Sequence, residues 1–325
     1  MAAAEFQASG LDDLGRTIAL LDAADANIRR TFLTLIGEAQ GLRPLEEIID
    51  MINTGRTYEA LALIDDVGPG LNEAISAAYV AAGVSVAAAL RESRVMPLIR
   101  FDSLTQRGVL QLQQSQARLV RELTAQQSSA LQITLQEGLR AGLPPAQIAR
   151  NLRGSIGLTG RQAQSVANYR KLLVNQSSQA LNRALRNPRY DAAVARSIAN
   201  KTPLTQMQID RMVEGYERNL LAYRAQVIGS TEALAAVNAG EAEMWAQAVD
   251  RGLDGRNVEQ RWHTLNDGRE RDSHGYMDGQ TRPLGVAFQS GNGIYLRYPG
   301  DGSAPAREVA GCRCVVSRSF LAPPV

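Results

Sequence analysis

The sequence contains few cysteine, histidine, lysine and aromatic residues. Two cysteines and two histidines occur among 325 residues, and phenylalanine, tryptophan and tyrosine together make up 5% of the chain. Two cysteines cannot form a disulfide framework, which favours synthesis in a reducing compartment such as the cytoplasm. Because aromatic residues are scarce and alanine, leucine, glutamine and arginine are abundant, we expect helices over most of the length.

We expect neither a secretory signal nor a membrane span. The opening residues, MAAAEFQASGLDD, lack the basic and apolar regions of a signal peptide. Residues 74–90 carry no charge, but they are rich in alanine, serine and glycine and are flanked by Glu73 and Arg91. A helix that spans a bilayer needs about 20 predominantly apolar residues. We therefore expect a buried, closely packed helix at 74–90 and no stable membrane span.

The formal net charge of +2 hides a segregation of charge along the chain. Residues 1–100 contain 8 basic and 14 acidic side chains, whereas residues 101–200 contain 13 and 4. The central basic zone is almost wholly arginine, which suits bidentate contact with phosphate or carboxylate. Two interpretations stay open: non-specific contact with nucleic-acid phosphates, and solvated ion pairs with acidic side chains. The side chains available for phosphate contact are Arg150, Arg153, Arg161, Arg170, Lys171, Arg183, Arg186 and Arg189.

Apolar spacing and capping patterns predict long helices before residue 255. Thr159 with Gln162, and Thr205 with Gln208, match the capping box that opens a helix. Gly229 is expected to bend the last helix, and the glutamine-rich helix near 109–137 suits self-association as well as a solvated face. The expected helices cover 14–35, 45–52, 58–67, 74–90, 109–137, 145–154, 161–185 and 206–249.

The character of the sequence changes after about residue 255. Short apolar, β-branched or aromatic pieces alternate there with glycine, proline, serine and asparagine, which predicts a small α+β module. The predicted fold is a mainly α N-terminal body followed by this module, with an acidic region 1–100, a basic-to-mixed region 101–254 and the module 255–325. About seventy residues bury only a modest apolar area. We therefore expect a metal or a polar network to help hold the module together.

Two stretches resemble the minor head proteins of tailed phages, also called head morphogenesis or MuF-like proteins. The first is 224–241, with Thr231-Glu232 followed by Asn238-Ala239-Gly240. The second stretch comprises Trp262-x-Thr264, Asp267-x-Arg269-x-Arg271, His274, Asp278-Gly279-Gln280, Pro283 and Cys312-Arg313-Cys314. The resemblance implies a virion component that associates with the portal and acts in head assembly and in genome packaging or delivery.

The chain departs from this family at its cysteines. Many relatives carry a Cys-x-x-Cys pair where this chain has Arg271-Asp272-Ser273-His274. A zinc site of four cysteines, or of cysteine and histidine, is suspected in those relatives. This chain lacks part of that set of zinc ligands.

All cysteines and histidines lie between Trp262 and Val315, which makes this segment the candidate site. One interpretation is a zinc site of His274, Cys312 and Cys314 with His263 or Asp267. A second is a cysteine hydrolase or transferase, with a thiolate of Cys312 or Cys314, His274 as base and Asp267 or Asp278 orienting it. The third, which we prefer, is a structural polar network without catalysis and without a cofactor. Its members would be Trp262, Asp267, Arg269, Arg271, His274, Asp278, Cys312, Arg313 and Cys314.

The sequence thus predicts a non-enzymatic minor head protein, made in the host cytoplasm and located in the virion, inside the head or at the portal. The expected partners are the portal protein and other head proteins, non-specifically bound DNA, and further copies of the chain through its long helices. The competing functions are a cysteine-dependent enzyme and a DNA-binding protein that is not part of a virion.

Overall fold

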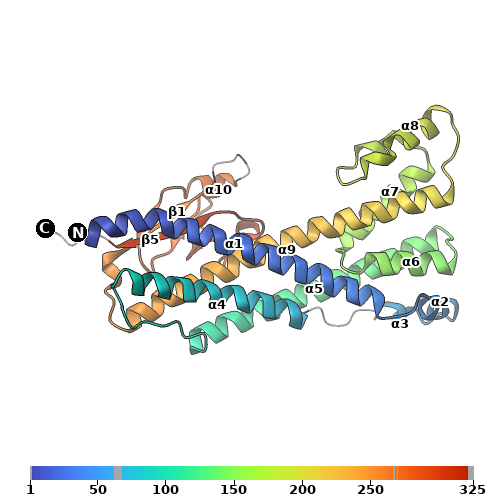
Figure 1. Ribbon diagram of the computed structural model, residues 1–325. Helices are drawn as coiled ribbons and strands as arrows, with labels where there is room; N and C mark the ends of the chain where they lie inside the picture. The colour runs from blue at the N-terminus through green and yellow to red at the C-terminus, as the bar shows by residue number, and fades with distance from the viewer. Residues whose placement is uncertain (1, 62–67, 266–267, 269, 321–325) are drawn as a thin grey trace. The chain divides into compact units, whose positions relative to one another are not determined.

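The computed structural model describes residues 2–61, 68–265, 268 and 270–320 (Figure 1). The predicted fold class is confirmed, because long helices form the N-terminal body and a small sheet-containing region follows them. The helices of the body are α1 Ala2–Gly41, α2 Leu45–Asn53, α3 Thr57–Leu61, α4 Gly68–Glu92, α5 Gln106–Arg140, α6 Pro145–Ser155, α7 Gly160–Val174, α8 Asp191–Ala199 and α9 Gln206–Asp250. Part of the helix expected at 58–67 lies outside the described residues.

The chain divides into two compact units, each built from separate stretches. Unit 1 contains 1–31, 70–117 and 226–325, and unit 2 contains 32–69 and 118–225. The three regions expected from charge and composition do not coincide with these units, because the helices α1, α5 and α9 each contribute to both.

Local sequence signals account for the starts of several helices. At α7 the Thr159 hydroxyl accepts a hydrogen bond from the Gln162 backbone, and the Gln162 side chain accepts one from the Thr159 backbone. Thr205 and Gln208 form the same reciprocal pair before α9. Both capping boxes are therefore confirmed.

One helix prediction was wrong in extent. The helix expected to reach Leu185 ends at Val174, because Gln176 takes a left-handed φ of 49° and short 3₁₀ turns follow. Gly229 was expected to bend the last helix, and α9 continues through this residue without a break. Gly229 instead permits close packing: a Cβ there would lie 2.4 Å from the Asp25 carboxylate of α1.

Helix α4 is long and apolar enough to cross a membrane, and half of its most apolar window is buried inside the protein. Tyr79, Ala82 and Leu90 are among its fully covered side chains. The expectation of a closely packed helix at 74–90 agrees with this burial.

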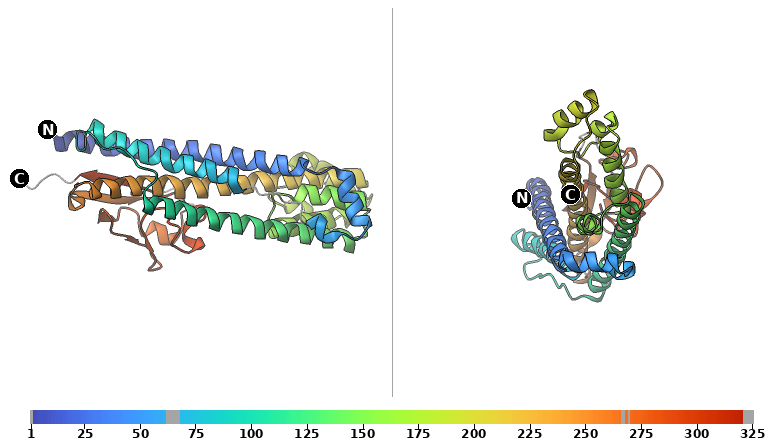
Figure 2. Two further views of the ribbon diagram at one scale, coloured as in Figure 1. Left: turned by 90° about the horizontal axis from the view of Figure 1, so that it is seen from below. Right: turned by 90° about the vertical axis from the view of Figure 1, so that its right-hand side faces the viewer.

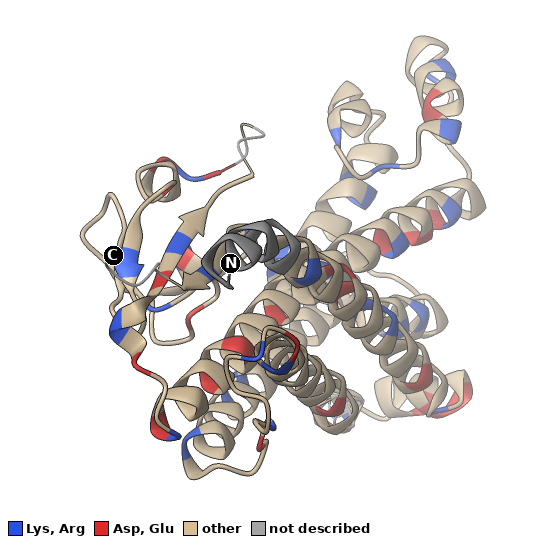
Figure 3. Cartoon of the chain, turned by 60° about the vertical axis from the view of Figure 1, so that its left-hand side comes forward, with Lys and Arg blue, Asp and Glu red and all other residues tan. Residues whose placement is uncertain are grey.

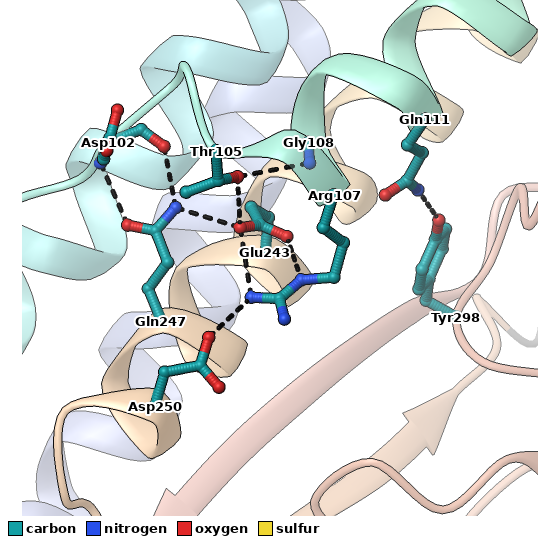
Figure 4. A network of polar contacts seen from close by, with 9 residues as sticks. All are labelled: Asp102, Thr105, Arg107, Gly108, Gln111, Glu243, Gln247, Asp250 and Tyr298. Atoms are coloured by element: carbon teal, nitrogen blue, oxygen red, sulfur yellow. Dashed lines mark hydrogen bonds and ion pairs between the residues drawn. The ribbon is translucent and has the colours of Figure 1, made fainter.

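A polar network in unit 1 holds the start of α5 beside the end of α9 (Figure 4). The buried carboxylate of Glu243 accepts hydrogen bonds from Arg107 Nε at 2.7 Å, Thr105 at 2.8 Å and Gln247 at 3.0 Å. Because this carboxylate is covered on all sides, its hydrogen bonds compensate for the lost hydration. The same picture shows the Gln111 side chain of α5 donating to the Tyr298 hydroxyl.

The C-terminal region forms a three-stranded antiparallel sheet with β1 in the centre, beside the last part of α9 (Figure 2). β1 pairs with β5 in a register that places Trp262 opposite Val316 and His263 opposite Val315. The small elements are β1 Val258–His263, α10 Asp272–Gly275, β2 Thr281–Pro283, β3 Phe288–Gln289, β4 Tyr295–Leu296, α11 Ala306–Val309 and β5 Val315–Phe320.

The core of this module lies under β1 and is closed by α9. Trp262 is fully buried and packs edge-on against Phe288 at 5.3 Å between ring centroids. Leu234 of α9 belongs to the same apolar cluster, as do Cys312 and Cys314. The predicted site residues therefore form part of the module's core.

Candidate functional site

A buried cysteine–histidine cluster lies between α10 and the segment that leads into β5. His274 belongs to α10, and Cys312 and Cys314 follow α11. The two sulfur atoms lie 3.4 Å and 3.5 Å from the same ring nitrogen, His274 Nδ1. The three residues are 1%, 4% and 3% exposed, so the cluster is shielded from solvent.

Backbone geometry brings these three side chains together. The His274 backbone N–H donates to the Arg271 carbonyl, which closes the short turn of α10. Gly311 has a φ of 64°, a conformation that glycine adopts without strain, and it turns the chain from α11 towards Cys312. The Gly311 N–H donates to the Thr231 hydroxyl of α9 at 3.1 Å. This contact anchors the cysteine segment to α9.

The second nitrogen of His274 faces Glu308. His274 Nε2 lies 3.2 Å from Glu308 Oε2, and both side chains are 1% exposed. The Ser273 hydroxyl and the Asn292 amide also donate to this carboxylate, at 3.2 Å and 2.9 Å. Burial opposes the ionisation of Glu308, but the hydrogen bonds from Asn292, Ser273 and His274 outweigh it, so its pKa lies below the ordinary value.

An ionised Glu308 fixes the tautomer of His274. A carboxylate only accepts hydrogen bonds, so Nε2 carries the proton and Nδ1 presents a lone pair to the two sulfur atoms. Trp262 packs edge-on against the imidazole, with 5.8 Å between ring centroids, and restricts its rotation.

The two thiols share their protons unequally. The hydrogen bond from the Cys314 thiol is the main cause that lowers the pKa of Cys312. The pKa of Cys314 is raised, because its proton is held on the Cys312 sulfur and because the site is buried. The pair therefore favours one thiolate on Cys312 and one thiol on Cys314.

This arrangement has two chemical uses. Two thiolates and a neutral imidazole are soft ligands of the kind that bind zinc. A thiolate beside an imidazole is also a nucleophile–base pair. Burial of the cluster favours metal binding over nucleophilic catalysis, because a nucleophile must contact its substrate whereas a metal ion can be enclosed.

The structure assigns the other predicted residues to different places. Asp267 and Arg269 lie outside the described residues. Asp278 Oδ1 accepts a hydrogen bond from the Thr264 N–H at 2.7 Å, which connects the residue after β1 with the segment after α10. Arg271 donates to the Ala310 carbonyl. Arg313 is half-buried and has an interaction partner within the protein.

His263, one of the two alternatives for a further zinc ligand, does not belong to the cluster. It lies on β1, and its Nε2 is 2.7 Å from the Ser317 hydroxyl of β5. Strand register explains this result, because the ring of His263 reaches the neighbouring strand and not the core cluster. Among the described residues, the group with metal-ligand spacing consists of His274, Cys312 and Cys314.

Sequence reasoning missed Glu308, Asn292 and Ser273. Glu308 precedes Cys312 by four residues, and no motif marks it as a partner of a histidine 34 residues away. The available signal was general: a histidine that binds metal through one nitrogen usually donates from the other to a carboxylate or carbonyl.

Several side chains of the basic zone already have partners within unit 2. Arg170 pairs with Asp210 at 2.6 Å, Lys171 with Glu137 at 2.5 Å and Arg186 with Asp191 at 2.8 Å. Arg153 donates to the Arg43 carbonyl, and Arg150 donates to Gln147. Figure 3 shows acidic segments interspersed with basic ones along the helices. Phosphate contact stays a prediction that now rests mainly on Arg161, Arg183 and Arg189.

Comparison with models of known protein families gives no match for this chain, and comparisons with curated proteins and with solved structures give none either.

Proposed function

We propose that this protein is a minor head protein of a tailed phage that acts structurally, at the portal, in head assembly and in genome packaging or delivery. The observation that carries the proposal is a contact between the two stretches that resemble this family. Gly311, beside the cysteine pair, donates to Thr231 of the first stretch at 3.1 Å. Leu234 enters the module's core, and Gly300 lies against the backbone of Ala235.

A second contact joins the first stretch to β5, which begins directly after Cys314. Arg318 of β5 donates to Glu241 of α9 at 3.2 Å, and the side chains are 2% and 4% exposed. Two motifs chosen by resemblance alone thus form one packed unit, as expected if they belong to one inherited module. Chance similarity at two places would not require them to meet.

Burial of the cysteine–histidine cluster favours a structural role over an enzymatic one. An enzyme that used Cys312 as its nucleophile would need a path for substrate to the sulfur, but Cys312 is 4% exposed and His274 is 1% exposed. We propose that these residues hold the module together, and that the helical body supplies surfaces for the portal and neighbouring head proteins.

A complementation experiment tests the proposal. A stop codon is placed early in the gene, in the phage genome that carries it, and a plasmid supplies the wild-type chain. We expect the stop codon to reduce the yield of infectious, DNA-filled particles and the plasmid to restore it. An unchanged yield without the chain would contradict an essential role in the head.

A further inference from the structure

We propose that His274, Cys312 and Cys314 bind one zinc ion, as a structural site that closes the C-terminal module. His274 Nδ1 and the two thiolates are the protein ligands, and water takes the fourth position. The site is a property of the folded chain and does not depend on which assembly the chain joins.

The distances between the ligand atoms match a tetrahedral zinc site. With Zn–S about 2.3 Å and Zn–N about 2.0–2.1 Å, a tetrahedral angle of about 109° places sulfur and nitrogen roughly 3.6 Å apart. The observed separations between His274 Nδ1 and the two sulfur atoms are 3.4 Å and 3.5 Å. All three ligand atoms lie within 4.8 Å of one another. An ion could therefore enter with small movements of the side chains.

The surroundings of His274 are those of a metal ligand. Its Nε2 faces the buried carboxylate of Glu308, which Asn292 and Ser273 hold in place. Such carboxylate–histidine pairs leave the other nitrogen unprotonated and make it a better ligand. A histidine that only filled space would not need two further side chains to orient its carboxylate partner.

Charge and ligand type favour zinc over other common ions. Two thiolates neutralise a doubly charged cation in a site where an uncompensated charge would be costly. Magnesium and calcium prefer oxygen ligands, whereas thiolate and imidazole suit zinc. Zinc replaces the thiol protons, which pass to solvent, and no electrons are transferred.

The site would link two segments that are distant in sequence. His274 lies on α10, whereas the cysteines lie 38 and 40 residues later, just before β5. The module has a small core, so a metal link between its two halves supplies stability that its apolar contacts alone do not. Three protein ligands with water in the fourth position is the ligand count of catalytic zinc sites. Here all three ligands are buried, which leaves little surface for a substrate and favours a structural ion.

Metal analysis of the full, untagged chain tests the proposal. The wild type, Cys312→Ser, Cys314→Ser and His263→Ala are purified under reducing conditions with zinc, and bound metal is measured by mass spectrometry after exhaustive dialysis. We expect about one zinc per wild-type chain, the same for His263→Ala, and loss in both cysteine variants. His263 is the matched control, because it is the other histidine of the module and faces Ser317.

Three further measurements keep the test decisive if a cysteine variant fails to fold. Chelation should lower the Tm of the wild type and added zinc should restore it. Cobalt should give a thiolate charge-transfer absorption. Glu308→Gln should keep the stoichiometry but weaken zinc affinity about 10–100-fold. A folded wild-type chain that retains no zinc, shows no cobalt band and keeps its Tm on chelation would overturn the proposal.

Discussion

Glu217 is a buried carboxyl group whose ionisation is coupled to folding. It is 8% exposed, and a Cβ on Gly154 would lie 2.7 Å from its Oε2. Burial is the main cause that raises its pKa to about 8; Arg170 and Arg218 act against this shift, while Glu214 and Asp210 add to it. The side chain borders a cavity of about 320 Å³ within unit 2.

This carboxyl group predicts a loss of stability as pH rises. The folded protein binds the proton of Glu217 more tightly than the unfolded chain, whose pKa is near 4.5. The free energy of unfolding should therefore fall between pH 4.5 and about 8. Glu217→Gln removes this dependence, so it should be the more stable protein above pH 8, by on the order of a few kcal/mol. Urea unfolding across this pH range measures the effect.

Glu214→Gln is the matched control for this measurement. Glu214 is an exposed acid on the same helix and adds only a small part of the shift of Glu217, so its replacement should keep most of the pH dependence of the wild type. Parallel curves for the wild type and Glu217→Gln would show that the carboxyl is not protonated in the folded state.

The limits of sequence reasoning are visible at single residues of the site. His274, Cys312 and Cys314 could be selected because they are scarce and clustered in sequence, and the structure brings them together. Glu308 could not be selected, because one glutamate among many acids carries no local mark of its contact with a distant histidine. The strand register places His263 beside Ser317 and away from the cysteines, and sequence alone does not fix that register.

At the scale of elements, glycine sets how closely α9 approaches α4. A Cβ at Gly240 would lie 2.1 Å from the Tyr79 carbonyl oxygen, so the helices could not keep their distance. Gly240→Ala should therefore destabilise the protein by roughly 1–3 kcal/mol or more. Thermal and urea unfolding of the variant measure the loss.

Gly215→Ala tests the same substitution in the same helix where there is room. A Cβ there would meet its nearest neighbour at 3.8 Å, in ordinary contact. Alanine should then stabilise the protein by roughly 0.5–1 kcal/mol, because glycine is the poorer helix former. Equal effects at both positions would mean that α4 and α9 do not pack as described.

The buried pair of Arg318 and Glu241 connects β5 with α9. The Thr17 hydroxyl of α1 also donates to Glu241, at 2.6 Å. Arg318→Met leaves the carboxylate buried without its cation, so we expect a loss of roughly 3–5 kcal/mol. Adding Glu241→Gln removes that charge and should recover part of the loss. If the double variant lost as much stability as the two single variants together, or more, the two charges would not stabilise each other as a buried ion pair.

Local sequence signals predicted that the helices exist, but they predicted the ends of the helices and their contacts less well. Capping boxes marked the starts of α7 and α9, and the absence of glycine and proline marked most of α5. The end of α7 depended on the left-handed Gln176, a conformation that its residue type does not announce. The glutamines of α5 suggested self-association or a solvated face, and both stay predictions. Two of these glutamines make contacts within the chain: Gln127 accepts from the Gly157 N–H at 2.6 Å, and Gln116 donates to Ser76 at 2.8 Å.

At the scale of the whole molecule, the charge segregation in the sequence is partly neutralised in the fold. Arginines of the basic zone pair with nearby acids such as Asp210 and Asp191, which leaves fewer cations for phosphate. Weak, salt-sensitive DNA contact is the form that the remaining arginines favour. A function in the head does not require the chain itself to read DNA.

The central claim is that the chain is a component of the virion. Quantitative mass spectrometry of purified particles, before and after release of the genome, tests it most directly. The account predicts that the chain is present in intact particles in a few copies for each portal assembly. Absence of the chain from purified particles, with all of it recovered in the soluble fraction of the host cell, would contradict the account.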